Sequence, residues 1–332
     1  MTCRRLISRR SLLQVAVASA ALASTGLAPT RAQENLKKAT LRLNYVPNAE
    51  HAPYYLGLKK GFFKQVGLDL EILAGTGSNE AVRLVGAGND MFGVSVADAV
   101  VTGRGRGAPV VSLAVLLQQS PNVLVSLKKN GIQKPTDLYG KKVGVPSRST
   151  VYAFWLAFIK AAGLDASKIQ TVDLGTTPTS GVLVGGGIDA AITLATNEMV
   201  ALELGGIELN VIDLVQYGVR SYGQVLFSND ALVKSQPELA KKMTAAALKS
   251  WQYTIAHTRE AVEILKGYVP ETKIESEMAK WKEITPRTKA RDGDVPFGHQ
   301  DLAGWRSTYE TFAAAGLIGT AYDPSDIIAK LK

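Results

Sequence analysis

The chain has 332 residues, of which 46% are apolar and 20% charged, so it is long enough for one large globular domain or two ordinary ones. Its formal charge is +9, but five arginines precede residue 33, where no acidic residue occurs. The remainder has 33 basic against 29 acidic residues, which excludes the strongly basic surface typical of nucleic-acid binding. The only cysteine, Cys3, lies in the same segment, so the rest of the chain has no disulfide and no thiolate metal site.

Residues 1–32 have the three parts of a secretory signal: a basic start, an alanine-rich apolar run and a small-residue cleavage site. Ser8-Arg9-Arg10-Ser11-Leu12-Leu13-Gln14 resembles the bacterial twin-arginine export signal, with Gln14 where lysine is usual. The apolar run is too short for a convincing membrane span. We therefore predict export to a periplasm through the twin-arginine machinery, with an uncleaved anchor as the alternative.

From Ala39 onward, short β-branched runs alternate with helical periodicity, which predicts βαβ units and mostly parallel sheet. Strands are expected at 39–45, 68–73, 91–94, 110–118, 122–127, 142–145, 169–173, 190–193 and 211–213. Helices are expected between them at 58–66, 79–86 and 150–162.

The last hundred residues are predicted to be helical. Ser235-Gln236-Pro237-Glu238 indicates a capping box that opens a long helix. Apolar residues then recur every fourth position on one face, at Leu239, Met243, Ala247, Trp251 and Ile255. Further helices are expected at 261–268, 274–281 and 301–315, forming a tail that covers the first lobe.

Two extended runs, 121–127 and 222–228, are predicted to cross between two lobes. Lobe 1 is then discontinuous, residues 36–122 plus 226–332, and lobe 2 is residues 123–225. Two crossings form a hinge, and the cleft between the lobes is the natural ligand site. A helix–glycine–acid–strand pattern, ending at Asp90 and again at Asp189, predicts pseudo-symmetry between the lobes.

Catalytic and nucleotide-binding motifs are absent from the sequence. The three histidines, His51, His257 and His299, do not stand at metal-ligand spacing, and no glycine cluster completes Gly-x-Gly-x-x-Gly after a strand. We therefore expect no catalytic residues, no metal and no cofactor.

The run Asn44-Tyr45-Val46-Pro47-Asn48-Ala49-Glu50-His51-Ala52-Pro53-Tyr54-Tyr55-Leu56, with Lys60-Gly61-Phe62-Phe63 after it, carries a family resemblance. It resembles the opening of ABC-importer solute-binding proteins of the nitrate/sulfonate/taurine and thiamine-pyrimidine class. Val94-Ser95-Val96-Ala97-Asp98 and Gly187-Ile188-Asp189-Ala190-Ala191 agree with it, and the resemblance covers about 40–230. It implies an α/β periplasmic-binding-protein type II fold with a helical tail, a periplasmic monomer, and an inner-membrane permease as partner.

The resemblance places Asn48, His51 and Tyr54 or Tyr55 in the cleft, one tyrosine facing it and the other packing in the core. A planar heteroaromatic ligand needs a ring to stack on and neutral donors and acceptors. For His51 the alternative is a structural loop histidine. Other candidates stand at strand ends or helix starts, where α/β folds bind ligands. They are Ser78, Asn79, Ser95, Asp98, Gln118, Gln119, Ser147, Arg148, Ser149, Thr150, Tyr152, Asn197 and Glu198.

Within the family, Pro-Asn-x-x-His followed by tyrosine is most similar to binders of thiamine pyrimidine precursors. Relatives of this class carry an acidic residue near the ligand amine, at the place of Glu198, commonly beside a tryptophan that this chain lacks. A riboflavin-type ligand is the first alternative. A sulfonate, nitrate or other organic anion is the second, based on Arg148 at a helix start. Fungal pyrimidine synthases resemble the family but carry a cysteine-rich motif, so we do not expect an enzyme.

Overall fold

The computed structural model describes residues 36–147, 150–175, 177–291 and 293–331. The predicted export signal, Arg148 and Ser149 lie outside the described residues. The part that is described belongs to one structural unit, Leu36–Lys332. None of its helices combines the length and apolar character needed to cross a membrane.

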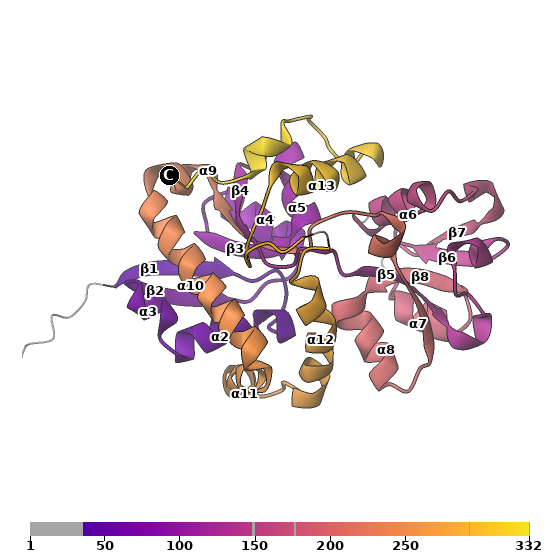
Figure 1. The fold of residues 1–332 in the computed structure, drawn as a ribbon, viewed down its shortest axis with the longest axis horizontal. Coiled ribbons are helices and arrows are strands. Elements are labelled where there is room, and N and C mark those ends of the chain that lie inside the picture. Colours follow the sequence, from indigo (N-terminus) through magenta and orange to yellow (C-terminus); the bar gives the residue numbers. More distant parts are fainter. Residues whose placement is uncertain (1–35, 148–149, 176, 292, 332) are drawn as a thin grey trace, which may run out of the picture. The chain divides into compact units, whose positions relative to one another are not determined.

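The first lobe is built on a five-stranded sheet with the strand order β2-β1-β3-β10-β4 (Figure 1). Its strands are β1 (Lys37–Arg42), β2 (Leu68–Leu73), β3 (Phe92–Val96), β4 (Val110–Val115) and β10 (Gln224–Asn229). β1 pairs in parallel with β2 and β3, whereas β10 runs antiparallel to β3 and β4. The sheet is therefore mixed, and its antiparallel member is the strand that returns from the second lobe.

The second lobe has a sheet of the same design, with the order β7-β6-β8-β5-β9. Its strands are β5 (Asn122–Leu127), β6 (Lys142–Val145), β7 (Gln170–Asp173), β8 (Ala190–Leu194) and β9 (Leu209–Asp213). β6 is parallel to β7 and β8, and β5 is antiparallel to β8 and β9. In both sheets the antiparallel strand is the first one after a crossing, so the two lobes share one topology, as the repeated glycine–acid pattern predicts.

Short helices connect the strands within each lobe. They are α2 (Ala52–Lys59), α3 (Phe62–Gln65), α4 (Ser78–Gly86) and α5 (Ala97–Gly105) in the first lobe, and α6 (Thr150–Ala161), α7 (Thr179–Val184) and α8 (Val200–Leu204) in the second. The helix expected at 58–66 is instead two helices, because Gly61 adopts a left-handed conformation (φ 72°) that ends one and begins the other. Pro53 fits the first turn of α2, where no intrahelical N–H bond is lost.

The carboxyl-terminal tail consists of α9 (Asp230–Ser235), α10 (Pro237–Ala256), α11 (Thr258–Tyr268), α12 (Ile274–Arg287) and α13 (Leu302–Ala314). The predicted capping box at Ser235 is wrong. Ser235 is the last residue of α9, and its hydroxyl donates to the carbonyl oxygen of Ala231 (2.7 Å). The structure caps α9 instead, through the Asn229 side chain, which accepts from the N–H of Leu232 (2.7 Å).

The tail packs on both lobes, not only on the first. α10 and α11 contact α2, and four residues of the predicted α10 stripe are buried, from Leu239 to Trp251. By contrast, α12 contacts α8 and the turn η5 (Ala195–Met199), and α13 contacts both α5 and α6. The rings of Phe154 on α6 and Phe312 on α13 meet edge to face, 5.3 Å apart. The apolar face of α13 therefore packs against α6, a helix of the second lobe.

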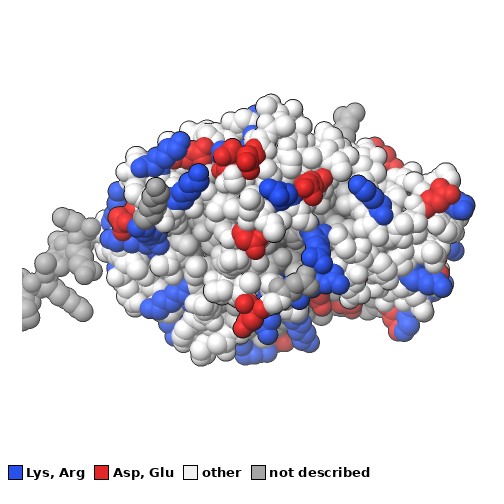
Figure 2. All heavy atoms as spheres, turned by 45° about the horizontal axis from the view of Figure 1, so that its top comes forward, with Lys and Arg blue, Asp and Glu red and all other residues white. Residues whose placement is uncertain are grey.

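Basic and acidic side chains are interspersed on the face shown in Figure 2. Exposed cations pair with nearby carboxylates, as Arg83 does with Glu80 and Lys60 with Glu260. This distribution agrees with the small net charge that remains beyond residue 33.

Candidate functional site

A cavity of about 770 Å³ is lined by residues from both lobes. Its walls are the loop after β1, the starts of α4, α5 and α6, and the segment after β8; the crossing residues Leu117, Pro121, Asn122 and Gln224 complete it. These segments follow the carboxyl ends of strands, the edge at which α/β sheets bind ligands. Among the predicted site residues, Asn48, Ser78, Asn79, Asp98 and Glu198 line this cleft, as do Thr150 and Asn197.

Asn48 and Glu50 reach the cleft from η1 (Ala49–His51), a single turn after β1. The Asn48 side chain accepts from the N–H of Glu50 (3.0 Å) and so caps the turn. From the other side, the carboxylate of Glu277 on α12 accepts from the N–H of Ala49 (2.5 Å) and pairs with Lys280 (2.8 Å). The tail thus fixes the turn that carries two cleft side chains.

His51 does not face the cleft, which corrects its expected position. Its side chain is fully buried, Nδ1 accepts from the N–H of Asn48 (3.2 Å), and Nε2 lies 2.8 Å from Oδ1 of Asn44. Because Nδ1 is an acceptor, Nε2 carries the proton and donates to Asn44. Burial lowers the pKa of His51 to about 3, so the ring is neutral. His51 therefore positions Asn44 and Asn48, which do line the cleft.

Neither Tyr54 nor Tyr55 faces the cleft, although one of them was expected to. Both lie on the buried side of α2, against the tail. The Tyr54 ring meets Trp251 edge to face at 6.5 Å, and the Tyr55 ring lies 5.1 Å from that of Tyr268. Among the described residues that line the cleft, the aromatic one is Tyr45, in the loop after β1, which is half exposed.

The start of α4 contributes Ser78 and Asn79 to the cleft wall. The Asn44 amide donates to the Ser78 hydroxyl (3.3 Å), so this helix start is joined to the loop after β1. Ser95 is fully buried behind the wall, and its hydroxyl donates to the carbonyl oxygen of Ser78 (3.4 Å). Ser95 therefore supports the helix start and does not line the cleft.

Two carboxylates of the first lobe that line the cleft have raised pKa values, and hydroxyl groups of the second lobe oppose the shift. Burial raises the pKa of Asp98, while bonds from the Thr150 hydroxyl and the Ala99 N–H oppose that shift. Burial likewise raises the pKa of Glu50, opposed by a bond from the Thr196 hydroxyl and by the charge of Lys280.

In the second lobe, Asn197 and Glu198 line the cleft from η5, and the hydroxyl of Thr193 donates to the Glu198 carboxylate. Ser147 and Tyr152 do not line it. The N–H of Ser147 donates to Asp173 (3.0 Å), and Tyr152 packs beside the core. Successive helical side chains differ in direction by roughly 100°, so α6 presents Thr150 and Val151 to the cleft and turns Tyr152 away.

Gln118 lies in a different cavity, of about 320 Å³, and donates to the carbonyl oxygen of His299 (2.7 Å). Its neighbour Leu117 lines the cleft instead. Gln119 also points to this second cavity and donates to the carbonyl oxygen of Lys289 (2.9 Å). Neither glutamine belongs to the cleft.

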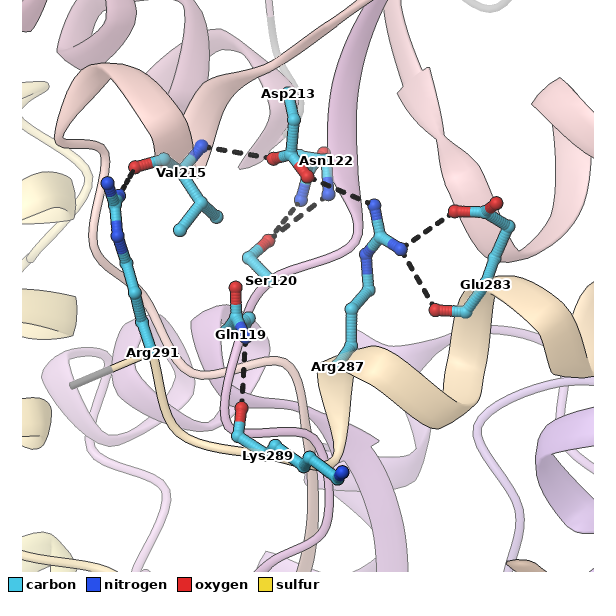
Figure 3. A network of polar contacts seen from close by, with 9 residues as sticks. All are labelled: Gln119, Ser120, Asn122, Asp213, Val215, Glu283, Arg287, Lys289 and Arg291. Atoms are coloured by element: carbon cyan, nitrogen blue, oxygen red, sulfur yellow. Dashed lines mark hydrogen bonds and ion pairs between the residues drawn. The ribbon is translucent and has the colours of Figure 1, made fainter. Parts of the chain in front are cut away.

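A polar network ties the end of α12 to the hinge (Figure 3). Arg287 pairs with Glu283 (2.8 Å) on its own helix and with Asp213 (3.3 Å) at the end of β9. Beyond the helix, Arg291 donates to the carbonyl oxygen of Val215, again in the second lobe. The tail of the first lobe is therefore bound to the second lobe beside the crossings.

Sequence reasoning missed many of the cleft residues, among them Tyr45, Glu50, Asn122 and Gln224. The last two begin the crossing strands Asn122-Val-Leu-Val-Ser-Leu and Gln224-Val-Leu-Phe-Ser-Asn. Each of these two similar apolar strands begins with a polar residue. This pattern predicts two matching polar groups at the hinge.

The cleft is rich in carboxylates. Glu50, Glu80, Asp98 and Glu198 line it, and its described lining includes no lysine, arginine or histidine. Arg83 pairs with Glu80 (2.7 Å). In the described ranges, no group of three or more His, Cys, Asp or Glu side chains is placed to hold a metal ion.

Several known proteins resemble this chain. A formylaminopyrimidine-binding protein of Halalkalibacterium halodurans is 28% identical over 276 residues, 82% of this chain and 83% of that protein. The riboflavin-binding protein RibY of Chloroflexus aurantiacus is 26% identical over 320 residues, 91% and 88% of the two chains. A 4-amino-5-hydroxymethyl-2-methylpyrimidine phosphate synthase of Legionella pneumophila is 30% identical over 242 residues, 70% and 75% of the two chains.

The fold agrees with that of the periplasmic aliphatic sulphonate binding protein SsuA of Escherichia coli, with a TM-score of 0.72 over 88% of this chain and 91% of that one. The two sequences are 13% identical, so this likeness concerns the fold. The model of the family described as NMT1/THI5 like matches residues 48–261. Because that match spans well over half of the sequence, the chain belongs to the NMT1/THI5-like family.

Proposed function

We propose that this protein is the periplasmic solute-binding component of an ABC importer and that it captures a small planar heteroaromatic solute, such as a pyrimidine precursor of thiamine. The observation that carries the proposal is the cleft itself. It lies at the carboxyl ends of strands from two lobes of one topology, and both lobes line it. A ligand held by both lobes stabilises the closed arrangement and shifts the hinge equilibrium toward it.

The lining suits a pyrimidine with an exocyclic amine. Such a ring offers N–H donors and ring-nitrogen acceptors in one plane. Carboxylates and side-chain amides face the cleft, at Asn48, Glu50 and Asp98 among others, and Tyr45 supplies a ring on which a heteroaromatic ligand stacks. The similarity to a formylaminopyrimidine-binding protein supports this choice.

A riboflavin-type ligand is the second candidate. A volume of about 770 Å³ exceeds what a single pyrimidine ring fills, and it lies within the usual range for sites that bind larger cofactors. The similarity to riboflavin-binding RibY supports it. A sulfonate, nitrate or other organic anion has less support, because the described lining offers it no cationic side chain.

The partners follow from this role. The closed protein presents its solute to an inner-membrane permease, and the twin-arginine machinery delivers the chain to the periplasm. We propose a monomer that binds neither nucleic acid nor a cofactor. Relatives include both binding proteins and a pyrimidine phosphate synthase. We propose binding without catalysis, because beyond Cys3 the sequence has no cysteine for the cysteine-rich motif of the fungal synthases.

Calorimetric titration and thermal-shift assays of the chain from Gln33 test the proposal. The panel comprises 4-amino-5-hydroxymethyl-2-methylpyrimidine, riboflavin, taurine and nitrate. We expect the pyrimidine, or failing that riboflavin, to bind and to raise the melting temperature. Asn48→Ala should weaken binding, whereas Asn210→Ala, on β9 and outside the cleft, should not. Stabilisation by taurine alone would refute the heteroaromatic ligand, and release of a phosphorylated pyrimidine by the chain would favour an enzyme.

A further inference from the structure

We infer that the cleft accepts only solutes that donate hydrogen bonds and carry no negative charge, so that it takes an unphosphorylated amine and rejects its phosphate ester and sulfonates. The inference rests on the proposed solute-binding function and specifies the chemistry of that same site. Its basis is a pair of buried amide oxygens at equivalent places in the two lobes.

Gln224 begins β10 and is 1% exposed, yet it lines the cleft. Its Nε2 donates to the carboxylate of Glu50 (2.9 Å). An ionised carboxylate only accepts hydrogen bonds, so this contact fixes the orientation of the amide and turns Oε1 elsewhere. Gln224 Oε1 is buried and has no hydrogen-bond partner among the described residues.

Asn122 begins β5 and repeats this arrangement. It is 6% exposed and lines the cleft, and its Nδ2 donates to the Ser120 hydroxyl (2.8 Å; Figure 3). Its Oδ1 is likewise buried without a partner within the described ranges. A buried acceptor left unsatisfied costs free energy, and a ligand that donates to it recovers that cost. Two such acceptors at one hinge select a ligand with at least two donors.

The charges around these two amide oxygens also favour a ligand that donates hydrogen bonds over an anionic one. Glu50, which is half-buried, and Asp98, which is buried, border the cleft. The nearby ammonium of Lys280 is paired with Glu277 (2.8 Å), and Glu277 also accepts from the Ala49 N–H, so this pair brings no net positive charge. An anionic solute would enter beside carboxylates with no lysine, arginine or histidine in the described lining to receive it. An amino group or a protonated ring nitrogen satisfies the same groups.

Matched ligand pairs test the inference by calorimetry on the chain from Gln33. One pair is 4-amino-5-hydroxymethyl-2-methylpyrimidine and its phosphate ester, and another is riboflavin and its phosphate ester. A third compares the aminopyrimidine with the same ring lacking the amine. We expect the des-amino ring to bind at least about tenfold more weakly than the parent, the loss typical of a buried acceptor left unpaired. We expect a loss of at least about tenfold for the phosphate ester too, because its negative charge would lie beside the cleft carboxylates.

A variant pair assigns the effect to Gln224. Gln224→Met removes the amide at nearly constant length and should narrow the ratio between the amino and des-amino rings to about threefold or less. Gln118→Met removes the same group in the neighbouring cavity and should leave the ratio unchanged. If Gln224→Met does not fold, the ligand pairs on the unaltered chain still decide the question.

The outcomes separate the inference from the function on which it rests. Equal or tighter binding of a phosphate ester, taurine or nitrate overturns the selection against anions while leaving solute binding intact. An unchanged ratio in folded Gln224→Met overturns the role of its amide oxygen. Failure of every compound to bind removes the proposed function and the inference together.

Discussion

The Nε2 atom of His51 lies 2.8 Å from Oδ1 of Asn44, and this contact joins separate segments of the cleft wall. His51 holds the η1 turn through the Asn48 N–H, and Asn44 continues to the Ser78 hydroxyl at the start of α4. A neutral histidine behind the wall thus positions three cleft residues and does not itself line the cleft. These contacts depend on a neutral ring, because Nδ1 must be free of a proton to accept from the Asn48 N–H while Nε2 donates to Asn44.

This dependence predicts a pH effect on stability. The pKa of His51 is about 3 in the folded protein, lowered by burial from an ordinary value of 6.5. The unfolded chain therefore binds a proton that the folded chain excludes, and the free energy of unfolding falls as the pH drops below 6.5. The slope is about 1.4 kcal/mol per pH unit, so roughly 2 kcal/mol is lost between pH 6 and 4.5.

Urea unfolding at several pH values measures this loss. His51→Gln should be less stable at pH 7, but its stability should fall less steeply, so the two curves converge on acidification. His257→Gln, at the exposed end of α10, controls for removal of an imidazole. If the free energy of unfolding fell equally with pH in the native chain and in His51→Gln, the prediction would be contradicted.

Glu50→Gln tests the half-buried carboxylate that borders the cleft. Because burial raises the pKa of Glu50, its charge opposes folding at neutral pH, and the unliganded variant should have the higher melting temperature. The gain should vanish below about pH 4.5, where the carboxyl is protonated in both states. The same substitution should weaken binding of an aminopyrimidine roughly tenfold or more, since a charge-assisted bond is lost.

Glu80→Gln is the matched control, because Glu80 also lines the cleft but pairs with Arg83 on an accessible face. Its pKa is lowered by Arg83, so this variant should lose stability at neutral pH where Glu50→Gln gains it. If both variants gained stability at neutral pH, or both lost it, the opposite pKa shifts of Glu50 and Glu80 would be contradicted.

Much of the fold follows from hydrophobic periodicity. The boundaries of β5 and β6 agree with the sequence prediction, and the extended runs at 121–127 and 222–228 contain the strands β5 and β10. Strand direction does not follow from periodicity, because β5 and β10 carry the same apolar pattern as the parallel strands. The division of the tail between the lobes also depends on which apolar faces meet, as Phe312 and Phe154 do.

The site was less predictable because sequence proximity does not fix the direction of a side chain. Asn48 and His51 belong to one four-residue turn, yet the first lines the cleft and the second lies behind it. Tyr54 and Tyr55 are both taken by the tail, whose position is known only in three dimensions. By contrast, Ser78, Asp98 and Glu198 do line the cleft, since strand ends and helix starts share one edge of each sheet, and their contact with a ligand stays a prediction.

Arg287→Met tests the ion pairs by which Arg287 joins α12 to the second lobe. Arg287 is 7% exposed, and its loss leaves Asp213 and Glu283 without their cation. Both carboxylates are partly exposed, so we expect a loss of about 1–3 kcal/mol, less than for a fully buried pair. The freed second lobe should populate more open arrangements, which small-angle scattering detects as a larger radius of gyration. Arg259→Met, which breaks an exposed pair with Glu275 in the same tail, should change neither quantity measurably.

Gly75→Ala tests the close approach that shapes the cleft loop. A Cβ at this position would lie 1.9 Å from the carbonyl oxygen of Leu43, a backbone atom that cannot yield, and the N–H of Gly75 donates to the carbonyl oxygen of Tyr45 (3.1 Å). The segments that follow β1 and β2 must therefore separate, at a cost of about 1–3 kcal/mol, and the loop bearing Asn44 and Tyr45 must move. Urea unfolding should show the loss, and ligand binding should weaken with it. Gly267→Ala supplies the opposite control: it lies near the end of α11 with nothing within 4 Å of the added Cβ, so the same substitution should stabilise the protein by about 0.5–1 kcal/mol. A free energy of unfolding in Gly75→Ala equal to that of the unaltered chain would contradict the close contact with Leu43.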